Sequence, residues 1–256
     1  MIVKTEAIVL NSFKYGESSK IITLYTKDFG KIKVIAKGAR KAKNKFGSSL
    51  DPLSYCQICF YKKPSTELYL LSDAEHVVPL RKIQDSYYHL SAGLIIAEAI
   101  NITQDVNEVN QELFALSTKV LKFLNEIPKS PFSVSSYFLI KLSENIGFAI
   151  DFQSHPEGLA DTELADRDKL FFKKIYFSIE RGSFAQISKE NNILSVETNI
   201  ALALFKISNL PLDKVGELML DRNSILQIND FFNVYFSYHL DRKNSFKTMN
   251  LFKTIL

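Results

Sequence analysis

The sequence predicts a multidomain α+β protein, in which a five-stranded β-barrel such as an OB-fold, over residues 1–80, precedes an all-helical domain over residues 81–256. The first 80 residues contain short segments of alternating apolar and polar side chains separated by turn signals. After Pro79, apolar residues recur with helical spacing. Charge divides the chain at the same place, because residues 1–80 hold 13 Lys and Arg against 7 Asp and Glu, whereas the remainder holds 19 against 21.

Five short strands account for the predicted barrel. A Lys-Asp-Phe-Gly turn signal separates the second strand from the third, and a longer link separates the third from the fourth. A small closed barrel accommodates such strands, although a small sandwich fragment or an SH3-like barrel fits the same pattern. The predicted strands are Thr5–Leu10, Ser19–Thr26, Lys31–Lys37, Leu53–Tyr61 and Glu67–Leu71.

The remainder of the chain is predicted to be helical. Ser130 and Pro131 form a helix start, with Pro at the first helical position, and Gly147 ends that helix. Residues 151–192 are polar and less regular, with one helix predicted within them. The predicted helices are Asp85–Ile102, Gln111–Asn125, Pro131–Ile146, Thr162–Phe177, Val196–Asn209, Leu212–Leu220 and Ser224–Leu240.

A basic run distinguishes the predicted barrel. Residues 29–50 contain seven cations and no acid, so the positive excess of the whole chain lies in this run. A cluster of this kind attracts polyanions, because neutralising several phosphates together releases condensed counterions. Nucleic acid is therefore the expected partner, and a solvated charged loop is the alternative. The seven cations are Lys31, Lys33, Lys37, Arg40, Lys41, Lys43 and Lys45.

Strand alternation divides the basic run between two faces. In the third strand Lys31, Lys33 and Lys37 lie on one face, about 6.6 Å apart at each second residue, and the apolar residues between them face the core. The link that follows adds the remaining cations and places Phe46 beside them. Cations with an adjacent aromatic ring are typical of single-strand binding, so Phe46 is predicted to stack on a base.

Other side chains give no sign of catalysis or of a metal centre. Cys56 and Cys59 form a CxxC in a predicted strand, where positions i and i+3 point to opposite faces, and no second pair supplies further ligands. Two structural cysteines are therefore expected, and no cofactor. Because no catalytic constellation is recognisable, the protein is not expected to be an enzyme. No apolar run reaches the roughly 20 residues that span a bilayer, and no signal peptide is recognisable, so a cytoplasmic protein is expected.

The segment from Thr5 to Pro52 resembles the N-terminal domain of RecO, a family of bacterial DNA repair and recombination mediators. The motifs that carry the resemblance are TEAIVL, YGESSKI, the GK after the hairpin turn, and AKGARK before an FGSSLDP loop. The resemblance implies an OB-fold that binds single- and double-stranded DNA and a nucleoid-associated protein in the cytoplasm. It also implies annealing of complementary strands and cooperation with RecR in loading RecA on DNA coated by single-strand-binding protein (SSB).

The resemblance also implies that the helical domain binds the acidic C-terminal tail of SSB in an apolar pocket with a basic rim. An alternative is an interaction adaptor whose main partner is such a tail and whose nucleic-acid binding is non-specific. Some relatives carry a four-cysteine zinc module in this half, but residues 151–192 contain no Cys, so no metal is expected. The candidate rim residues are Arg81, Lys82, Lys119, Lys122 and Lys141.

Overall fold

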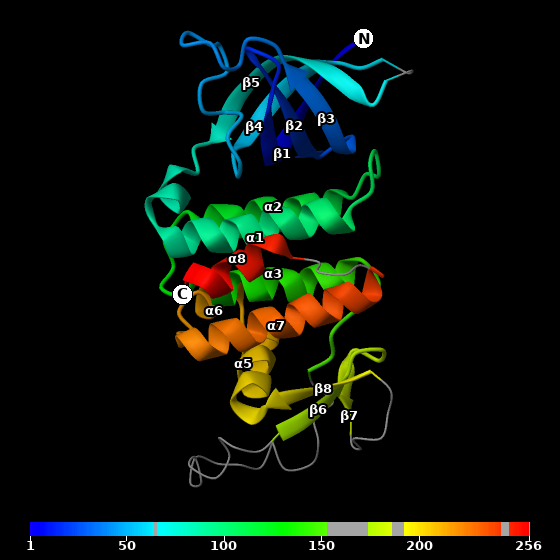
Figure 1. Cartoon of the computed structure of the whole chain (residues 1–256), viewed down its shortest axis with the longest axis vertical. Coiled ribbons are helices and arrows are strands. Elements are labelled where there is room, and N and C mark those ends of the chain that lie inside the picture. The colour runs from blue at the N-terminus through cyan, green and yellow to red at the C-terminus, as the bar shows by residue number, and fades with distance from the viewer. Residues whose placement is uncertain (64–65, 153–173, 186–191, 242–245, 256) are drawn as a thin grey trace. The chain divides into compact units, whose positions relative to one another are not determined.

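The computed structural model describes residues 1–63, 66–152, 174–185, 192–241 and 246–255. Figure 1 shows the elements along the chain. They divide into two compact units, Met1–Ile127 and Pro128–Leu256. The first unit contains the predicted barrel together with the two helices that follow it, and the second contains the remaining elements. None of the described helices is long and apolar enough to cross a membrane.

The first unit begins with a closed five-stranded barrel, which confirms the predicted class. Its strand order is β1-β2-β3-β5-β4, and the barrel closes through antiparallel pairing of β1 with β4 and parallel pairing of β3 with β5. Closure leaves no strand edge unpaired along the sheet. The strands are β1 (Ile2–Tyr15), β2 (Ser19–Thr26), β3 (Gly30–Ala36), β4 (Tyr55–Tyr61) and β5 (Leu68–Val78), so β1 and β5 are longer than predicted.

Alternation along the strands fills the barrel. Ala7 and Val9 of β1 pack with Ile22 of β2 and Val34 of β3 in one buried cluster. Along each strand every second side chain points into the barrel, and the side chains between them point outward, as the period of two requires. Cys56 of β4 belongs to the same cluster, and its Sγ lies 3.7 Å from the carbonyl oxygen of Ala7.

Two helices pack beside the barrel in the first unit. A 3₁₀ turn, η1 (Arg81–Asp85), leads into α1 (Tyr87–Thr103) and α2 (Gln111–Leu124), close to the predicted bounds. The side chain of Asn110 caps α2, because its Oδ1 accepts a hydrogen bond from the amide of Leu113 at 2.9 Å.

The loop between α1 and α2 is hydrogen-bonded to the start of β3. The amide of Asn107 donates to the carbonyl oxygen of Lys31 at 2.9 Å, and the Tyr25 hydroxyl donates to the carbonyl oxygen of Asn110 at 3.0 Å. Gly30 has a positive φ of 62°, and a Cβ built on it would lie 1.9 Å from the carbonyl oxygen of Glu108. Only glycine therefore permits this close approach.

The second unit combines helices with a small sheet. The sheet has the antiparallel order β7-β6-β8, and the aromatic face of α7 is buried. Phe231 and Tyr235 of that face lie close to Phe177 of β6, with ring centroids 5.0 and 6.0 Å from it. The elements are α3 (Pro131–Asn145), β6 (Lys174–Ser178), β7 (Ser183–Ala185), β8 (Ile193–Glu197), α5 (Thr198–Asn209), α6 (Leu212–Val215), α7 (Arg222–His239) and α8 (Lys247–Ile255).

The sheet corrects the expectation that this half is all-helical. Residues 162–173 of the predicted helix Thr162–Phe177 lie outside the described residues, and its last four residues belong to β6. Ile175 and Phe177 are buried while Tyr176 between them is exposed, so the period in this segment is two. The predicted helix Leu212–Leu220 is also wrong in length, because α6 ends at Val215.

We expect replacement of Gly30 by Ala to destabilise the first unit by about 2–5 kcal/mol, because the new methyl group adds a steric clash to an unfavourable positive φ. Gly16→Ala is the matched control, since Gly16 also has a positive φ, of 55°, but has no atom within 4 Å of a built Cβ. Urea denaturation followed by circular dichroism measures both variants. Equal losses of stability would contradict the role of the Glu108 contact.

We expect the two thiols to differ in reactivity. Burial raises the pKa of Cys56 to about 12, whereas Cys59 is partly exposed. The thiolate is the nucleophile, so iodoacetamide at pH 8 should modify Cys59 in the native protein and both residues in urea. Peptide mass spectrometry locates the modified residue. Comparable native rates at Cys56 and Cys59 would show that the barrel opens far more readily than its packing indicates.

Candidate nucleic-acid interface

The basic run lies on the outer side of the barrel and on the link that follows β3. Ile32, Val34 and Ala36 point into the core, so Lys33 points outward by alternation. Six of the seven predicted cations are exposed, namely Lys33, Lys37, Arg40, Lys41, Lys43 and Lys45. The structure therefore presents most of the predicted basic surface to solvent.

Lys31 differs from the other six cations because it is half-buried. Its Nζ donates a hydrogen bond of 2.6 Å to the carbonyl oxygen of Asn101, in the last turn of α1. A cation at this position interacts favourably with the negative end of the helix dipole. Lys31 thus joins the barrel to α1, which corrects the prediction that it belongs to the exposed surface.

Arg40 fixes the start of the basic link against the turn between β1 and β2. Its amide donates to the carbonyl oxygen of Ser18 at 2.9 Å, and its Nη1 donates to the carbonyl oxygen of Gly16 at 2.8 Å. The amide of Lys41 closes a turn on Gly38 at 3.0 Å. These bonds hold the cations of the link next to the β1–β2 turn.

Phe46 is buried, and the prediction that its ring stacks on a base is wrong. The side chain is 3% exposed and belongs to the barrel core. Asn44 turns the chain inward, because its Oδ1 accepts hydrogen bonds from the amides of Phe46 and Gly47 at 3.1 and 2.8 Å. Lys45 lies over the covered ring at 5.2 Å from its centroid and donates to the carbonyl oxygen of Ser72.

Four of the exposed cations have no charge partner in the described part of the chain. Neither a hydrogen bond nor an ion pair engages the ammonium groups of Lys33, Lys37, Lys41 and Lys43. Elsewhere, Lys20 pairs with Asp51 at 3.4 Å. Like charges held together without acids repel one another, and a bound polyanion relieves this repulsion.

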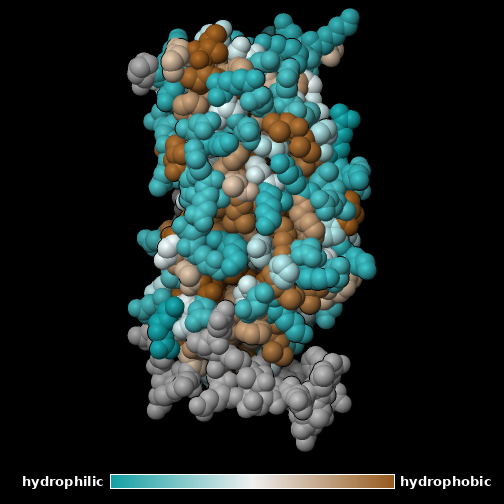
Figure 2. All heavy atoms as spheres, turned by 180° about the vertical axis from the view of Figure 1, so that it is seen from behind, coloured by the Kyte–Doolittle hydropathy of each residue, from teal (hydrophilic) through white to brown (hydrophobic). Residues whose placement is uncertain are grey.

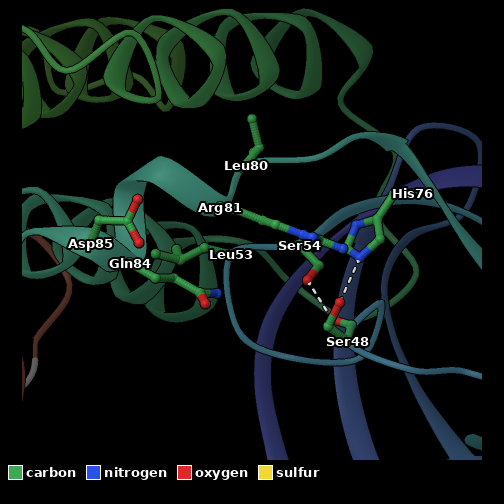
Figure 3. Close-up of a pocket in the computed structure, with 8 residues that line it drawn as sticks. All are labelled: Ser48, Leu53, Ser54, His76, Leu80, Arg81, Gln84 and Asp85. Atoms are coloured by element: carbon green, nitrogen blue, oxygen red, sulfur yellow. Dashed lines mark hydrogen bonds between the residues drawn. The ribbon is translucent and has the colours of Figure 1, made fainter.

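A pocket of about 310 Å³ lies in the same unit, between the link, the end of β5 and η1 (Figure 3). Inside it Ser48 Oγ and His76 Nε2 are 3.1 Å apart, and Ser54 Oγ donates to the carbonyl oxygen of Ser48 at 3.0 Å. The Nδ1 atom of His76 has no partner among the described residues, so no carboxylate orients the ring as a catalytic triad requires. The lining residues are Ser48, Leu53, Ser54, His76, Leu80, Arg81, Gln84 and Asp85.

The candidate rim residues for an acidic peptide do not share one unit. Arg81 lines the pocket together with Asp85, whose carboxylate is adverse to an acidic ligand. Lys122 lies over the ring of Tyr55 at 5.0 Å from its centroid. Lys141 belongs to the second unit and pairs with Glu144 at 2.8 Å. Lys82 in η1 and Lys119 in α2 are exposed in the first unit.

No group of three or more metal-ligating side chains occurs among the described residues. Cys56 lies in the barrel core, and its partner across the β4–β5 ladder is His76. Over most of the surface shown in Figure 2 the side chains are hydrophilic, and apolar residues form small separate patches.

Two exposed aromatic residues near the basic surface were missed from the sequence. Phe13 and Tyr15 occupy the end of β1, beyond the predicted end of this strand at Leu10. Their side chains are 62% and 53% exposed. The signal that could have found them is the resumed alternation of Phe13, Lys14 and Tyr15 immediately before the Gly16 turn.

Comparison with known proteins identifies the family to which the chain belongs. Models of the recombination protein O N-terminal and C-terminal parts match residues 1–80 and 84–247. A DNA repair protein RecO of Chloroherpeton thalassium is 29% identical over 260 residues, covering 100% of both chains. One of Salinibacter ruber is 36% identical over 148 residues, covering 58% of this chain and 57% of the relative. The chain therefore belongs to the RecO family of DNA repair proteins.

Proposed function

We propose that this protein binds single- and double-stranded DNA and acts as a mediator in recombinational repair. The observation that carries the proposal is the set of exposed cations without charge partners on the barrel, in a chain of the RecO family. Binding of this kind needs no catalytic step. Its energy comes from the release of counterions when Lys and Arg neutralise phosphates, so both strand types are bound without sequence preference.

Three of the cations stand on or beside ordered parts of the barrel. Lys33 lies on a rigid strand, Lys37 follows that strand directly, and Arg40 is held at the β1–β2 turn by its two hydrogen bonds to backbone oxygens. Positive groups on fixed elements lose little conformational entropy when a ligand binds. Lys41 and Lys43 extend the same surface along the link.

Annealing follows from the same surface. Two complementary strands repel each other through their phosphates, and a cationic surface that binds both strands lowers this repulsion.

We propose that the protein also cooperates with RecR to load RecA on DNA coated by SSB, with the acidic tail of SSB as a further partner. This part of the proposal rests on family membership. The geometry does not add to it, because the rim candidates are divided between the two units.

The triple variant Lys33→Glu, Lys37→Glu and Lys41→Glu should bind DNA more weakly and with a weaker dependence on salt. Loss of three phosphate contacts reduces the slope of log affinity against log salt by about two to three units. Fluorescence anisotropy of labelled single-strand and duplex oligonucleotides at several salt concentrations measures this slope for wild type and variant.

A variant with the same charge change provides the control, because Lys206, Lys214 and Arg222 are exposed residues of the second unit. Their replacement by Glu should leave most of the slope unchanged. If both triple variants lost the same affinity, net charge alone would explain binding, and the barrel would have no special role.

The mediator role predicts a result that DNA binding alone does not. RecA filament formation on SSB-coated single strands should accelerate only when both this protein and RecR are present.

A labelled peptide of the SSB tail, titrated against the full chain, tests the adaptor alternative. Tail binding without measurable DNA affinity would favour that alternative over the proposed function.

A further inference from the structure

The β1–β2 hairpin carries two aromatic side chains that do not contribute to any core. Phe13 and Tyr15 are 62% and 53% exposed, although exposed apolar rings forgo the stabilisation of burial. Among the described residues, no other aromatic ring lies in contact with either of them. Both rings are therefore available to a ligand.

The register of the barrel places both rings on its outer face. Ser12 pairs with Ile22, which points into the core, so the next pair, Phe13 with Ile21, points outward. Two residues further along, Tyr15 pairs with Ser19 and points outward as well. The two side chains thus project from one face of one strand, from Cα atoms about 6.8 Å apart at the rise of an antiparallel strand.

The same face carries the cations of β3. Ile21 of β2 pairs with Ile35 of β3, which continues the row that begins at Phe13, and Lys33 lies on this face two residues from Ile35. Strands β1 and β3 flank β2 in the barrel (Figure 1). Two strand spacings of about 4.8 Å each separate the aromatic row from the cationic row by about 10 Å.

Arg40 brings a further cation to the aromatic end of the hairpin. Its guanidinium donates to the carbonyl oxygen of Gly16, the residue directly after Tyr15. Glu17 is the one acid of this turn. Aromatic rings on one side and cations on the other match a nucleic-acid strand, in which flat bases project from a line of phosphates.

We propose that Phe13 and Tyr15 stack on bases of single-stranded DNA whose backbone runs along Lys33, Lys37 and Arg40. This inference rests on the proposed DNA-binding function and assigns to the hairpin the stacking role expected of Phe46. OB-folds in general bind oligonucleotides on strands 2 and 3 and on the loop between strands 1 and 2, which is where this surface lies.

The spacing of the rings selects single strands over duplexes. Consecutive bases in a duplex strand rise by about 3.4 Å, whereas the Cα atoms that carry the two rings are about 6.8 Å apart. Stacking on both rings therefore requires a stretched strand with its bases turned outward. A duplex can meet the cations but cannot offer bases to the rings, because its bases are stacked inside it.

Single-tryptophan variants test the contact directly, because the chain contains no Trp. In Phe13→Trp and in Tyr15→Trp, the added indole is the only one, and stacking on a base should quench its fluorescence. We expect quenching to saturate with an oligothymidylate and to be much smaller with a duplex of the same length at equal occupancy. Tyr88→Trp is the control, since Tyr88 is 51% exposed in the first turn of α1. Equal quenching of all three indoles would overturn the proposal.

Affinity measurements separate stacking from charge. Phe13→Leu with Tyr15→Leu keeps the apolar character and removes the rings, so single-strand affinity should fall about 5-fold or more for each ring. Duplex affinity and the salt slope should remain near wild type, and Tyr88→Leu should change neither. Urea midpoints of the variants confirm that these exposed substitutions leave the fold intact.

The outcomes distinguish this inference from the proposed function. If the leucine variant bound single strands as wild type does, while reversal of the cations weakened binding, the DNA-binding function would stand and the stacking residues would be wrong. A similar loss for single strands and duplexes would also overturn the stacking role. If the wild-type protein bound neither form of DNA, both proposals would fail.

Discussion

The docking of the α1–α2 loop on the start of β3 is the constraint on which the arrangement of the first unit depends. The backbone of Gly30 approaches that of Glu108 so closely that a side chain would overlap it. The carbonyl oxygen of Lys31 accepts a hydrogen bond from the amide of Asn107, and its ammonium donates one to the carbonyl oxygen of Asn101. One end of the basic strand is thereby covered by helices, and the other end, from Lys33 onward, remains open to solvent. The residues of β3 that hold the helices and those exposed to solvent are therefore different residues of the same strand.

Repulsion among the exposed cations at the open end of the strand lowers the stability of the fold. Lys33, Lys37, Lys41 and Lys43 stand close in sequence without a partner of opposite charge in the described residues, so their mutual repulsion disfavours the compact state. The barrel core offsets this repulsion with buried aliphatic residues and with Phe46, which anchors the link from inside. The anchor explains why a loop of such charge can be held at a defined position. Acidic residues placed among these cations would stabilise the fold but would cancel the positive field of this surface.

Sequence patterns predicted most of the barrel and the first three helices because a period of two or of 3.6 is a local property. They failed where direction depends on contacts distant in sequence. Phe46 directly follows the cations of the link, but the hydrogen bonds of Asn44 turn it inward. Lys31 has the alternation of an exposed residue, but α1 supplies a carbonyl oxygen to it. The end of β1 was missed because a bulge between Val9 and Asn11 interrupts the alternation before Phe13 resumes it.

Cations and rings on one face would divide the work of binding between affinity and strand selection. Because cations attract any phosphate backbone, they would bind single strands and duplexes alike and would let the protein remain on DNA after two strands have paired. The rings would act only where bases are unpaired, and they would cover the flat face of a base while its Watson–Crick edge stayed accessible. A strand held in this way can be read by a complementary strand. Under the proposed function, when pairing begins the bases would leave the rings for the duplex while the phosphates kept their contacts with the cations, so annealing would proceed without full release of the DNA.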